Sequence, residues 1–263
     1  MNYSIIIYII GMILKLEAAF MVLPIVTSLI YQETSGFAFL ITIILCLAIG
    51  IPLTWKKPTR KAFYTKEGFV TVALSWIVLS IMGAIPFVIS HSIPNPIDAL
   101  FETVSGFTTT GASILNNVEA LPHCMLIWRS FTHWIGGMGV LVFILSLLPL
   151  TGGYHMNLMK AESPGPSVSK LAPKVQSTAK ILYTIYFAMT VVQMILLLLG
   201  GMPLFDTICT AFGTAGTGGF GIKNDSMASY SPYLQNVITV FMILFGVNFN
   251  AYFFILTKKF AQA

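Results

Sequence analysis

Residues 104–113 read VSGFTTTGAS, and residues 211–221 read AFGTAGTGGFG. Each stretch lies at the end of a short apolar segment, at about 96–107 and 203–213, which is too short to cross a bilayer core of about 30 Å. Short apolar segments with glycine-rich ends are candidates for re-entrant helices, whose backbone is tolerated at membrane depth where protein or water satisfies it. Because long apolar stretches flank both segments, these two pieces decide the fold that we predict.

The composition of the chain excludes a water-soluble protein. Of its 263 residues, 56% are hydrophobic and 9% are charged, whereas a soluble domain carries roughly 25% charged residues. A soluble enzyme, a disordered regulator and a nucleic-acid-binding protein are therefore excluded, and no nucleic acid is expected as a partner. Cys46, Cys124 and Cys209 lie far apart without metal-type spacing, so they indicate neither a disulfide framework nor a zinc site. The sequence predicts an integral membrane protein.

Six apolar stretches are long enough to span a membrane, which takes about 20 residues of helix. The first of them lacks a small-residue cleavage site and is too long for a signal peptide, so we interpret it as a retained span. We therefore predict an all-α integral membrane fold with six transmembrane helices and two re-entrant pore helices that carry filter loops. The six stretches are 4–30, 36–54, 68–90, 125–148, 178–200 and 233–256.

The basic residues predict the orientation of the chain. Eleven of the 14 lysines and arginines fall between spans two and three, between spans four and five, or after span six. The opposite side carries six acidic residues, and Lys223 is its one base outside the helices. Under the positive-inside rule both termini are then cytoplasmic. The eleven bases are Lys56, Lys57, Arg60, Lys61, Lys66, Lys160, Lys170, Lys174, Lys180, Lys258 and Lys259, and the acids are Glu33, Asp98, Glu102, Glu119, Asp206 and Asp225.

The regions 68–150 and 178–258 follow one plan of span, short apolar helix, loop and span. We therefore divide the chain into two N-terminal transmembrane helices (1–55), a first pore repeat (66–150) and a second pore repeat (173–260). Two unrelated hydrophobic hairpins with glycine-rich ends are the alternative. Internal repeats are common in transport proteins, with the substrate path between them. A shift of 107 positions aligns Pro96 with Pro203, Thr103 with Thr210, Gly106 with Gly213, Thr110 with Thr217 and Gly111 with Gly218.

The glycines and threonines of the two loops suit the coordination of a cation. Glycine permits a positive φ and removes Cβ, so that consecutive carbonyl groups can point to one side. Threonine adds a hydroxyl on a compact, stiff side chain. An alkali cation that leaves water needs oxygen ligands, and rings of backbone carbonyls after a short pore helix supply them in potassium filters. Asp98, Glu102 and Asp206 on the outer side would raise the local cation concentration.

Three other interpretations of these loops stay open from the residues alone. A nucleotide-binding glycine loop would need a preceding strand and an acidic partner downstream, and the sequence offers neither. A glycine patch that lets two helices pack closely is the second alternative. An extracellular turn is the third, although no Pro, Asn or Asp follows the threonines until Asn116.

Several motifs, taken together and in order, resemble bacterial Trk-type potassium uptake proteins of the Trk/Ktr/HKT superfamily, with the TrkH-like branch the most similar. The resemblance runs from about residue 5 to the end of the chain. It implies a fold of four span–loop–span repeats around one pseudo-fourfold pore, preceded by two extra helices. This chain then corresponds to the N-terminal half of such a protein. The motifs are FETVSGFTTTGAS (101–113), WRSFTHWIGGMGVLVFILSLLP (128–149), AESPGP (161–166), GTAGTGGFG (213–221) and GVNFNAYF (246–253).

The resemblance also implies which residues would bind potassium, as the only metal ion and without any cofactor. The second loop has Gly-Thr-Gly-Gly-Phe where the family pattern is closer to Ala-Ile-Gly-Gly-Phe, a change that backbone ligands tolerate. We expect Glu102 and Arg129 to form a supporting pair behind the filter. The filter residues carried over are Thr109, Thr110 and Gly111 in the first loop and Gly216, Thr217 and Gly218 in the second.

By this resemblance, the chain is a pore-forming subunit for potassium transport in the bacterial cytoplasmic membrane, passive or coupled to another ion as in a symporter. A cytoplasmic nucleotide-binding regulator of the TrkA type would dock on the basic loop 151–180. Family members are nearly twice as long, so we expect a truncated half, completed by the missing half or by a second copy in a dimer. The alternative is a non-conducting structural or regulatory half-protein that assembles with a partner. A membrane enzyme is not expected, because the chain lacks a catalytic constellation.

Two ionisable residues, Lys15 and Glu17, lie inside the first span, where charge is costly. Spaced two apart, they do not share a helix face, so we expect each to meet another helix or to snorkel, in a structural role. The four histidines, His91, His123, His133 and His155, are scattered, and we interpret them as ordinary loop or interfacial residues.

Overall fold

The computed structural model describes residues 2–58, 65–139, 175–249 and 251–252, and every regular element in these ranges is a helix. The N-terminal group comprises α1 (Tyr3–Phe20), α2 (Val22–Ile30) and α3 (Gly36–Thr54). A second group follows with α4 (Thr65–Ile89), α5 (Pro96–Phe107) and α6 (His123–Met138). The third group is α9 (Val175–Leu199), α10 (Leu204–Ala215) and α11 (Pro232–Gly246). The all-α prediction is confirmed for the described part of the chain, whereas most of the basic loop 151–180 lies outside it.

Four described stretches are long and apolar enough to cross a membrane, namely Tyr3–Ile30, Gly36–Thr54, Lys66–Ile89 and Lys180–Leu199. The predicted spans 125–148 and 233–256 correspond to α6 and α11, which are shorter within the described residues. Part of each predicted span lies outside those residues, and α11 ends where Val247 takes an extended backbone with ψ of 144°.

The first predicted span, 4–30, is not one uninterrupted helix. It breaks at Met21, where α1 ends and α2 begins. Pro24 lies at the start of α2, and its ring nitrogen cannot donate a hydrogen bond to the carbonyl of Phe20. The break follows from that missing bond, and both pieces still point along one apolar stretch of 28 residues.

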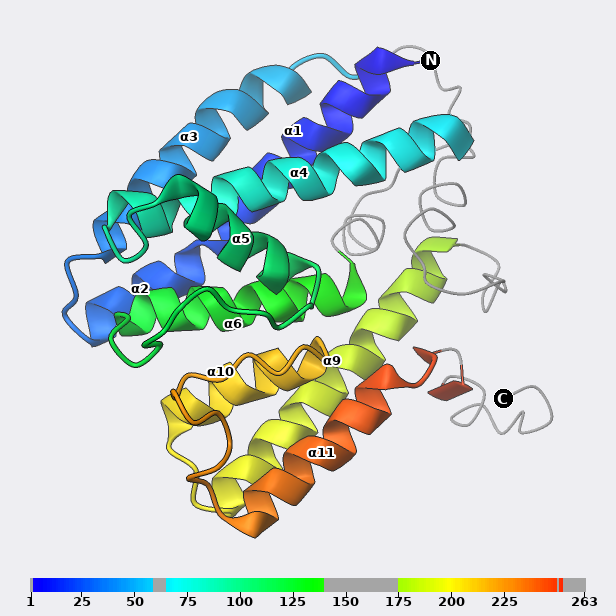
Figure 1. Ribbon diagram of the computed structural model, residues 1–263. Coiled ribbons are helices and arrows are strands. Elements are labelled where there is room, and N and C mark those ends of the chain that lie inside the picture. Colours follow the sequence, from blue (N-terminus) through cyan, green and yellow to red (C-terminus); the bar gives the residue numbers. More distant parts are fainter. Residues whose placement is uncertain (1, 59–64, 140–174, 250, 253–263) are drawn as a thin grey trace.

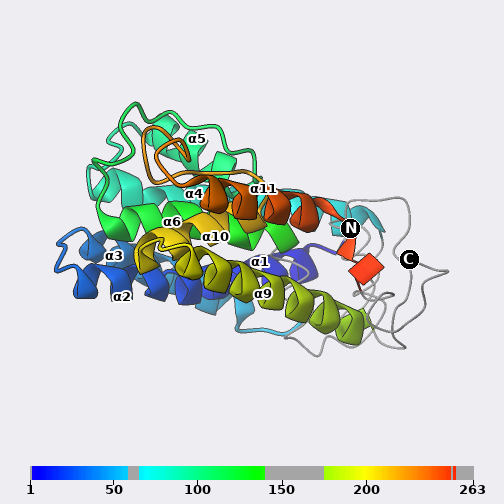
Figure 2. The same ribbon diagram turned by 90° about the horizontal axis from the view of Figure 1, so that it is seen from below.

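The helices pack around α6, which touches elements from all three groups. It contacts α2 of the N-terminal group, α5 of its own group and α10 of the third (Figures 1 and 2). The α1–α3 pair, in turn, packs against α4. Trp128 of α6 is fully buried and donates a hydrogen bond from Nε1 to the Gly83 carbonyl of α4, over 3.0 Å. The main apolar core therefore lies between α1, α4, α5 and α6.

The two ionisable residues of α1 differ in their surroundings. Lys15 donates from Nζ to Thr54 Oγ1 of α3 over 2.9 Å, so it meets another helix as predicted. Glu17 is buried, and neither of its carboxyl oxygens has a hydrogen-bond partner among the described residues. Glu17 faces the Gly83 position of α4, so it lies inside the core.

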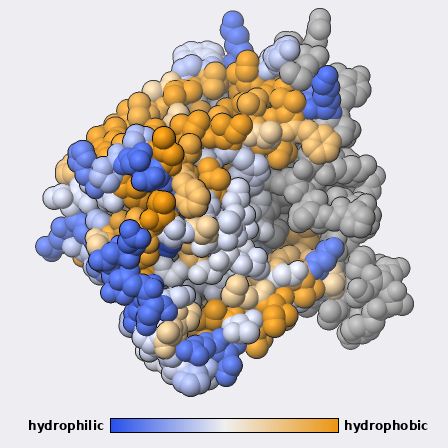
Figure 3. Space-filling view, in the orientation of Figure 1, coloured by the Kyte–Doolittle hydropathy of each residue, from blue (hydrophilic) through white to orange (hydrophobic). Residues whose placement is uncertain are grey.

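Large apolar side chains cover the outer flanks of the bundle, while polar residues gather at one end (Figure 3). Leu29, Phe37, Leu199 and Ile243 are each about two thirds exposed or more. Contiguous apolar surface of this kind marks a face that meets lipid or protein. The starts of α1, α4 and α9 lie at the opposite end from the starts of α5, α6 and α10 (Figure 1). Two ends separated by apolar flanks are the arrangement of a multi-pass membrane protein.

Candidate functional site

Two short helices, α5 and α10, enter the bundle and end in loops with the same backbone conformation. We call residues 108–122 the first loop and residues 216–231 the second loop. Thr109 has a φ of 56° and Thr217 a φ of 57°, and each is followed two residues later by a glycine of positive φ. A positive φ is a true outlier for a β-branched residue, and it costs of order 1–3 kcal/mol. The same strain at matching places shows that the two loops are built alike.

The structural match between the loops has a shift of 108, one more than the shift of 107 that aligns most identities. Helices α5 and α10 begin and end 108 positions apart, so Gly111 (φ 77°) corresponds to Gly219 (φ 73°) and not to Gly218. The physical reason lies in the two prolines. Pro96 is the first residue of α5 after the cap Asn95, whereas Pro203 is itself the cap before α10. Aligning the prolines therefore displaces everything after them by one residue.

The two loops touch each other. A side chain at Gly111 would overlap the carbonyl group of Gly218, and a Cβ at Gly218 would lie 2.8 Å from the carbonyl oxygen of Thr109. Gly111 therefore has two reasons to be glycine, its positive φ and this close approach. The stretches around Gly111 and Gly218 therefore lie side by side.

A buried carboxylate fixes the outgoing part of the first loop. Glu102 lies in α5 and is 1% exposed. It accepts hydrogen bonds from Ser113 Oγ at 2.9 Å and from the backbone N–H of Ile114 at 3.0 Å. Arg129 donates to the same carboxylate from Nε at 2.5 Å. A buried carboxylate that is both paired and hydrogen-bonded is a stiff support, so Glu102 ties the first loop to α6.

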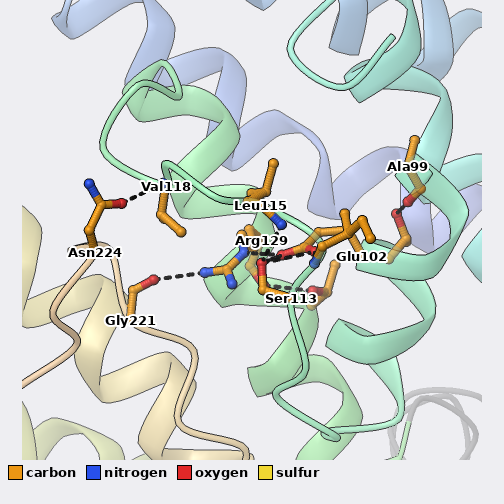
Figure 4. A network of polar contacts seen from close by, with 11 residues as sticks. Ala99, Glu102, Ser113, Leu115, Val118, Arg129, Gly221 and Asn224 are labelled. Carbon is orange, nitrogen blue, oxygen red and sulfur yellow. Dashed lines mark hydrogen bonds and ion pairs between the residues drawn. The ribbon is translucent and has the colours of Figure 1, made fainter. Parts of the chain in front are cut away.

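Arg129 also reaches the second loop, as Figure 4 shows. Its Nη1 donates to the Gly221 carbonyl over 2.7 Å, and its guanidinium carbon lies 3.5 Å from the centre of the Phe220 ring. Arg129 is 3% exposed, so these interactions are shielded from solvent. The predicted pair of Glu102 and Arg129 thus exists, and it joins both loops through one side chain.

His133, one helical turn after Arg129, lies against the same loop. Its ring is fully buried, with the ring centres of His133 and Phe220 4.1 Å apart. A side chain at Gly218 would overlap the His133 ring, and a Cβ at Gly216 would lie 2.7 Å from the His133 carbonyl oxygen. The interpretation of His133 as an ordinary loop or interfacial residue is wrong, because it is buried inside the bundle beside the second loop.

Asn224 joins the outer parts of the two loops. Its side-chain oxygen accepts from the backbone N–H of Val118 at 2.8 Å, and its side-chain nitrogen donates to Asn117 at 2.9 Å. Its own backbone N–H donates to Glu119 at 3.0 Å. Figure 4 shows Asn224 and Arg129 as two separate bridges between the loops.

Three acidic residues help to line a cavity of about 520 Å³ beside Asn224. Glu119, Asp206 and Asp225 line it together with Lys223. Asp206 accepts a hydrogen bond of 2.7 Å from Tyr230, and burial together with this acceptor raises the pKa of Tyr230. Of the three acids that the sequence assigns to the cation entrance, Asp206 lines this cavity, whereas Glu102 is buried behind the first loop.

The predicted filter residues lie in these loops with different exposures. Thr110 and Thr217 are exposed, and Thr109, Gly111 and Gly218 are half-buried. Gly216 is buried at the C-terminal end of α10, with a helical φ of −76°, so it precedes the open stretch. The sequence interpretation missed Gly219, which is exposed and has a positive φ. The sequence feature that could have identified Gly219 is its place as the second glycine of the Gly-Gly-Phe run.

Comparisons with known proteins agree on one family. The family model described as "TrkH: Cation transport protein" matches residues 35–261. The Trk system potassium uptake protein TrkH of Salmonella typhimurium is 39% identical over 264 residues, which cover 98% of this chain and 54% of that relative. The Trk system potassium uptake protein TrkG of Escherichia coli is 35% identical over 254 residues, which cover 95% of this chain and 52% of that relative.

A solved structure also matches the fold of this chain. The crystal structure of the potassium transporter TrkH from Vibrio parahaemolyticus matches with a TM-score of 0.80 and 31% sequence identity. The match covers 96% of this chain and 52% of that chain. The chain therefore spans about half the length of the relatives that it matches.

Proposed function

The chain belongs to the TrkH family of cation transport proteins, and on that basis we propose that it supplies half of a potassium-conducting pore through the cell membrane. We assign the ion-binding stretches to Thr109–Gly111 in the first loop and to Gly216–Gly219 in the second. Within the second stretch, Gly216 ends the pore helix, and Gly219 takes the role that Gly111 has in the first. The family consists of membrane ion transporters, so enzymatic chemistry is not part of this function.

The observation that carries the proposal is the matched strain of the two loops. Backbone strain of this size persists only where the surrounding structure enforces it, and it concentrates at functional sites. Thr109 and Thr217 take the same unfavourable φ at equivalent places, and their loops lie in contact. A cation that loses its water needs several oxygen ligands at once, which two adjacent carbonyl-bearing loops begin to provide.

We propose that two further loops complete the ring of ligands. The family resemblance implies four repeats, of which α4–α5–α6 would be the first and α9–α10–α11 the second, with α1–α3 as the extra pair. The remaining loops would come from a further pair of repeats, either in the same polypeptide or in an associated chain. A non-conducting half-protein is the competing outcome, and complementation by a chain that carries the later repeats decides between them.

The orientation that we propose places the acidic cavity outside the cell and both termini, with a docking site for a TrkA-type regulator, inside. Asn116, in the first loop, and Lys57, shortly after the end of α3, are exposed, and the three native cysteines are buried. An impermeant thiol reagent should label Asn116→Cys in intact cells, and Lys57→Cys only after the membrane is opened. The reverse labelling pattern would contradict this orientation.

The filter assignment is tested by ion competition in the complete transporter that contains this chain. Gly111→Ser should lower the preference for K⁺ over Na⁺ by about tenfold or more, because the new side chain overlaps the Gly218 carbonyl group. Gly201→Ser is the matched control, since Gly201 also has a positive φ (82°) but no neighbouring atom within 4 Å of its Cβ position. If Gly111→Ser and Gly201→Ser prefer K⁺ over Na⁺ equally, Gly111 is not part of the filter.

A further inference from the structure

One side chain of the second loop contacts two residues of α6. Arg129 and His133 are four residues apart, so they lie on the same face of the helix. The Phe220 ring contacts both, with the Arg129 guanidinium 3.5 Å from its centre and the His133 ring centre 4.1 Å away. Phe220 is 3% exposed and directly follows Gly219. We call Arg129, His133 and Phe220 the α6 clamp.

His133, a member of the α6 clamp, also contacts the backbone of the second loop. The His133 ring occupies the space that a side chain at Gly218 would need. On its other side, the carbonyl group of Gly218 occupies the space of a side chain at Gly111. An unbroken row of contacts therefore runs from His133 through Gly218 to the first loop.

Gly218 and Gly219 are glycines for different reasons. Gly219 has a positive φ of 73°, and only Met242 comes near its Cβ position, at 3.8 Å. Gly218 is not among the residues with positive φ, but the His133 ring leaves no room for a side chain. Conformation selects glycine at 219, whereas packing against His133 selects it at 218.

We propose that His133 is a positioning residue for ion selectivity, which sets the distance between the carbonyl stretches of the two loops through its contact with Gly218. This inference rests on the proposed potassium pore. A ring that packs tightly on both sides transmits a displacement of its helix to the loop, because packed interiors deform little. In this role His133 acts through its contact with Gly218 and not as an ion ligand.

The test is a size exchange between the two positions, made in the complete transporter that contains this chain. Gly218→Ala should lower the K⁺ over Na⁺ preference by about tenfold, because the added methyl group pushes against the His133 ring. Adding His133→Ala removes the overlap with the ring and leaves the approach of 2.8 Å to the Thr109 carbonyl oxygen, so the loss of preference should shrink from about tenfold to about threefold. Gly219→Ala is the matched control, because its defect is conformational and His133→Ala should not rescue it.

Two readouts separate this inference from the proposed function. Uptake of K⁺ by cells tests the pore, whereas the thermal stabilisation of purified protein by K⁺ against Na⁺ tests ion preference without transport. Rescue of the Gly218→Ala preference by His133→Ala supports the inference, even where uptake itself is absent. The inference is overturned if the double variant keeps the altered preference, if Gly218→Ala has the wild-type preference, or if the wild type itself binds without preferring K⁺. Rescue of melting temperature alone, with preference unrestored, also overturns it, because His133 would then be a packing residue only.

Discussion

The two loops share a backbone conformation, but they are supported in opposite ways. The first loop is held by its own helix group, through the carboxylate of Glu102 in α5. At the equivalent position of α10, Thr210 is buried, and its hydroxyl has no hydrogen-bond partner among the described residues. Around Gly218 and Gly221 the second loop is held instead from α6 of the other helix group, by Arg129 and His133, while Tyr230 further along the loop bonds Asp206 of α10. The second and third helix groups are therefore not independent modules, and α6 supports both loops.

The largest effect that this comparison predicts is for Arg129→Met. The change leaves the buried Glu102 carboxylate without its partner, which costs about 3–5 kcal/mol. Both loops should lose protection in hydrogen exchange, since Arg129 holds Gly221 as well as Glu102. Glu102→Gln, in contrast, should loosen mainly the first loop. Equal protection of the second loop in wild type and Arg129→Met would break the comparison.

The next prediction compares the two glycines of positive φ. Gly219→Ala should destabilise the protein by about 1–2 kcal/mol, the cost of a left-handed conformation for a residue with Cβ. Gly111→Ala should cost more, because its Cβ also overlaps the Gly218 carbonyl group. Thermal unfolding of the purified variants measures both values. If the two changes cost the same, the contact between the loops does not constrain Gly111.

The sequence predicts the short helices well and their alignment poorly. For α5 it predicts 96–107, and the structure has Pro96–Phe107, because Asn95 and Pro96 make a clear start signal. For α10 it predicts 203–213, and the structure has Leu204–Ala215, because Gly213 is accommodated within the helix. The identities counted at a shift of 107 include two prolines with different roles, which concealed Gly219 as the counterpart of Gly111.

Of the contacts that hold the two loops in place, the sequence predicts the pair of Glu102 and Arg129 but not the others. Arg129 meets Gly221 across 92 positions and Asn224 meets Val118 across 106. No local periodicity encodes which face of α6 meets the second loop. A buried histidine beside a glycine also looks the same in sequence as one in an interfacial loop. These features depend on tertiary packing, which only the folded chain reveals.

A third prediction concerns the anchor of α6 itself. Glu33 accepts hydrogen bonds from the backbone N–H groups of His123 and Cys124, at 2.7 and 2.9 Å, at the start of this helix. Burial opposes the charge, but the hydrogen bonds from Cys124 and His123 outweigh it and lower the pKa of Glu33. The stabilisation is therefore present at neutral pH and is lost as the pH falls below the ordinary glutamate value of about 4.3.

Glu33→Gln removes that charge and should lower stability at pH 7 by about 1 kcal/mol, as for the loss of a helix cap. The difference from the wild type should shrink as the pH falls towards 3. Thermal unfolding measured across this range gives both quantities. A difference that stays constant with pH would mean that the charge of Glu33 does not contribute to holding α6.

The smallest expected change in stability concerns Thr210, the residue of α10 at the position that Glu102 occupies in α5. Thr210 and Thr103 are both buried threonines of the short helices, 4% and 1% exposed. The Thr103 hydroxyl donates to the Ala99 carbonyl over 2.8 Å, whereas the Thr210 hydroxyl has no partner among the described residues.

Valine has nearly the same shape as threonine without the hydroxyl. Thr103→Val should therefore cost about 1 kcal/mol, the usual worth of one hydrogen bond, while Thr210→Val should be neutral or stabilising by about 1 kcal/mol. Thermal unfolding of the two variants side by side measures this difference in sign. A loss of stability in Thr210→Val as large as that in Thr103→Val would mean that the Thr210 hydroxyl is satisfied in the assembled protein. The short helices of both groups would then carry a satisfied polar side chain at the buried position that Glu102 occupies in α5.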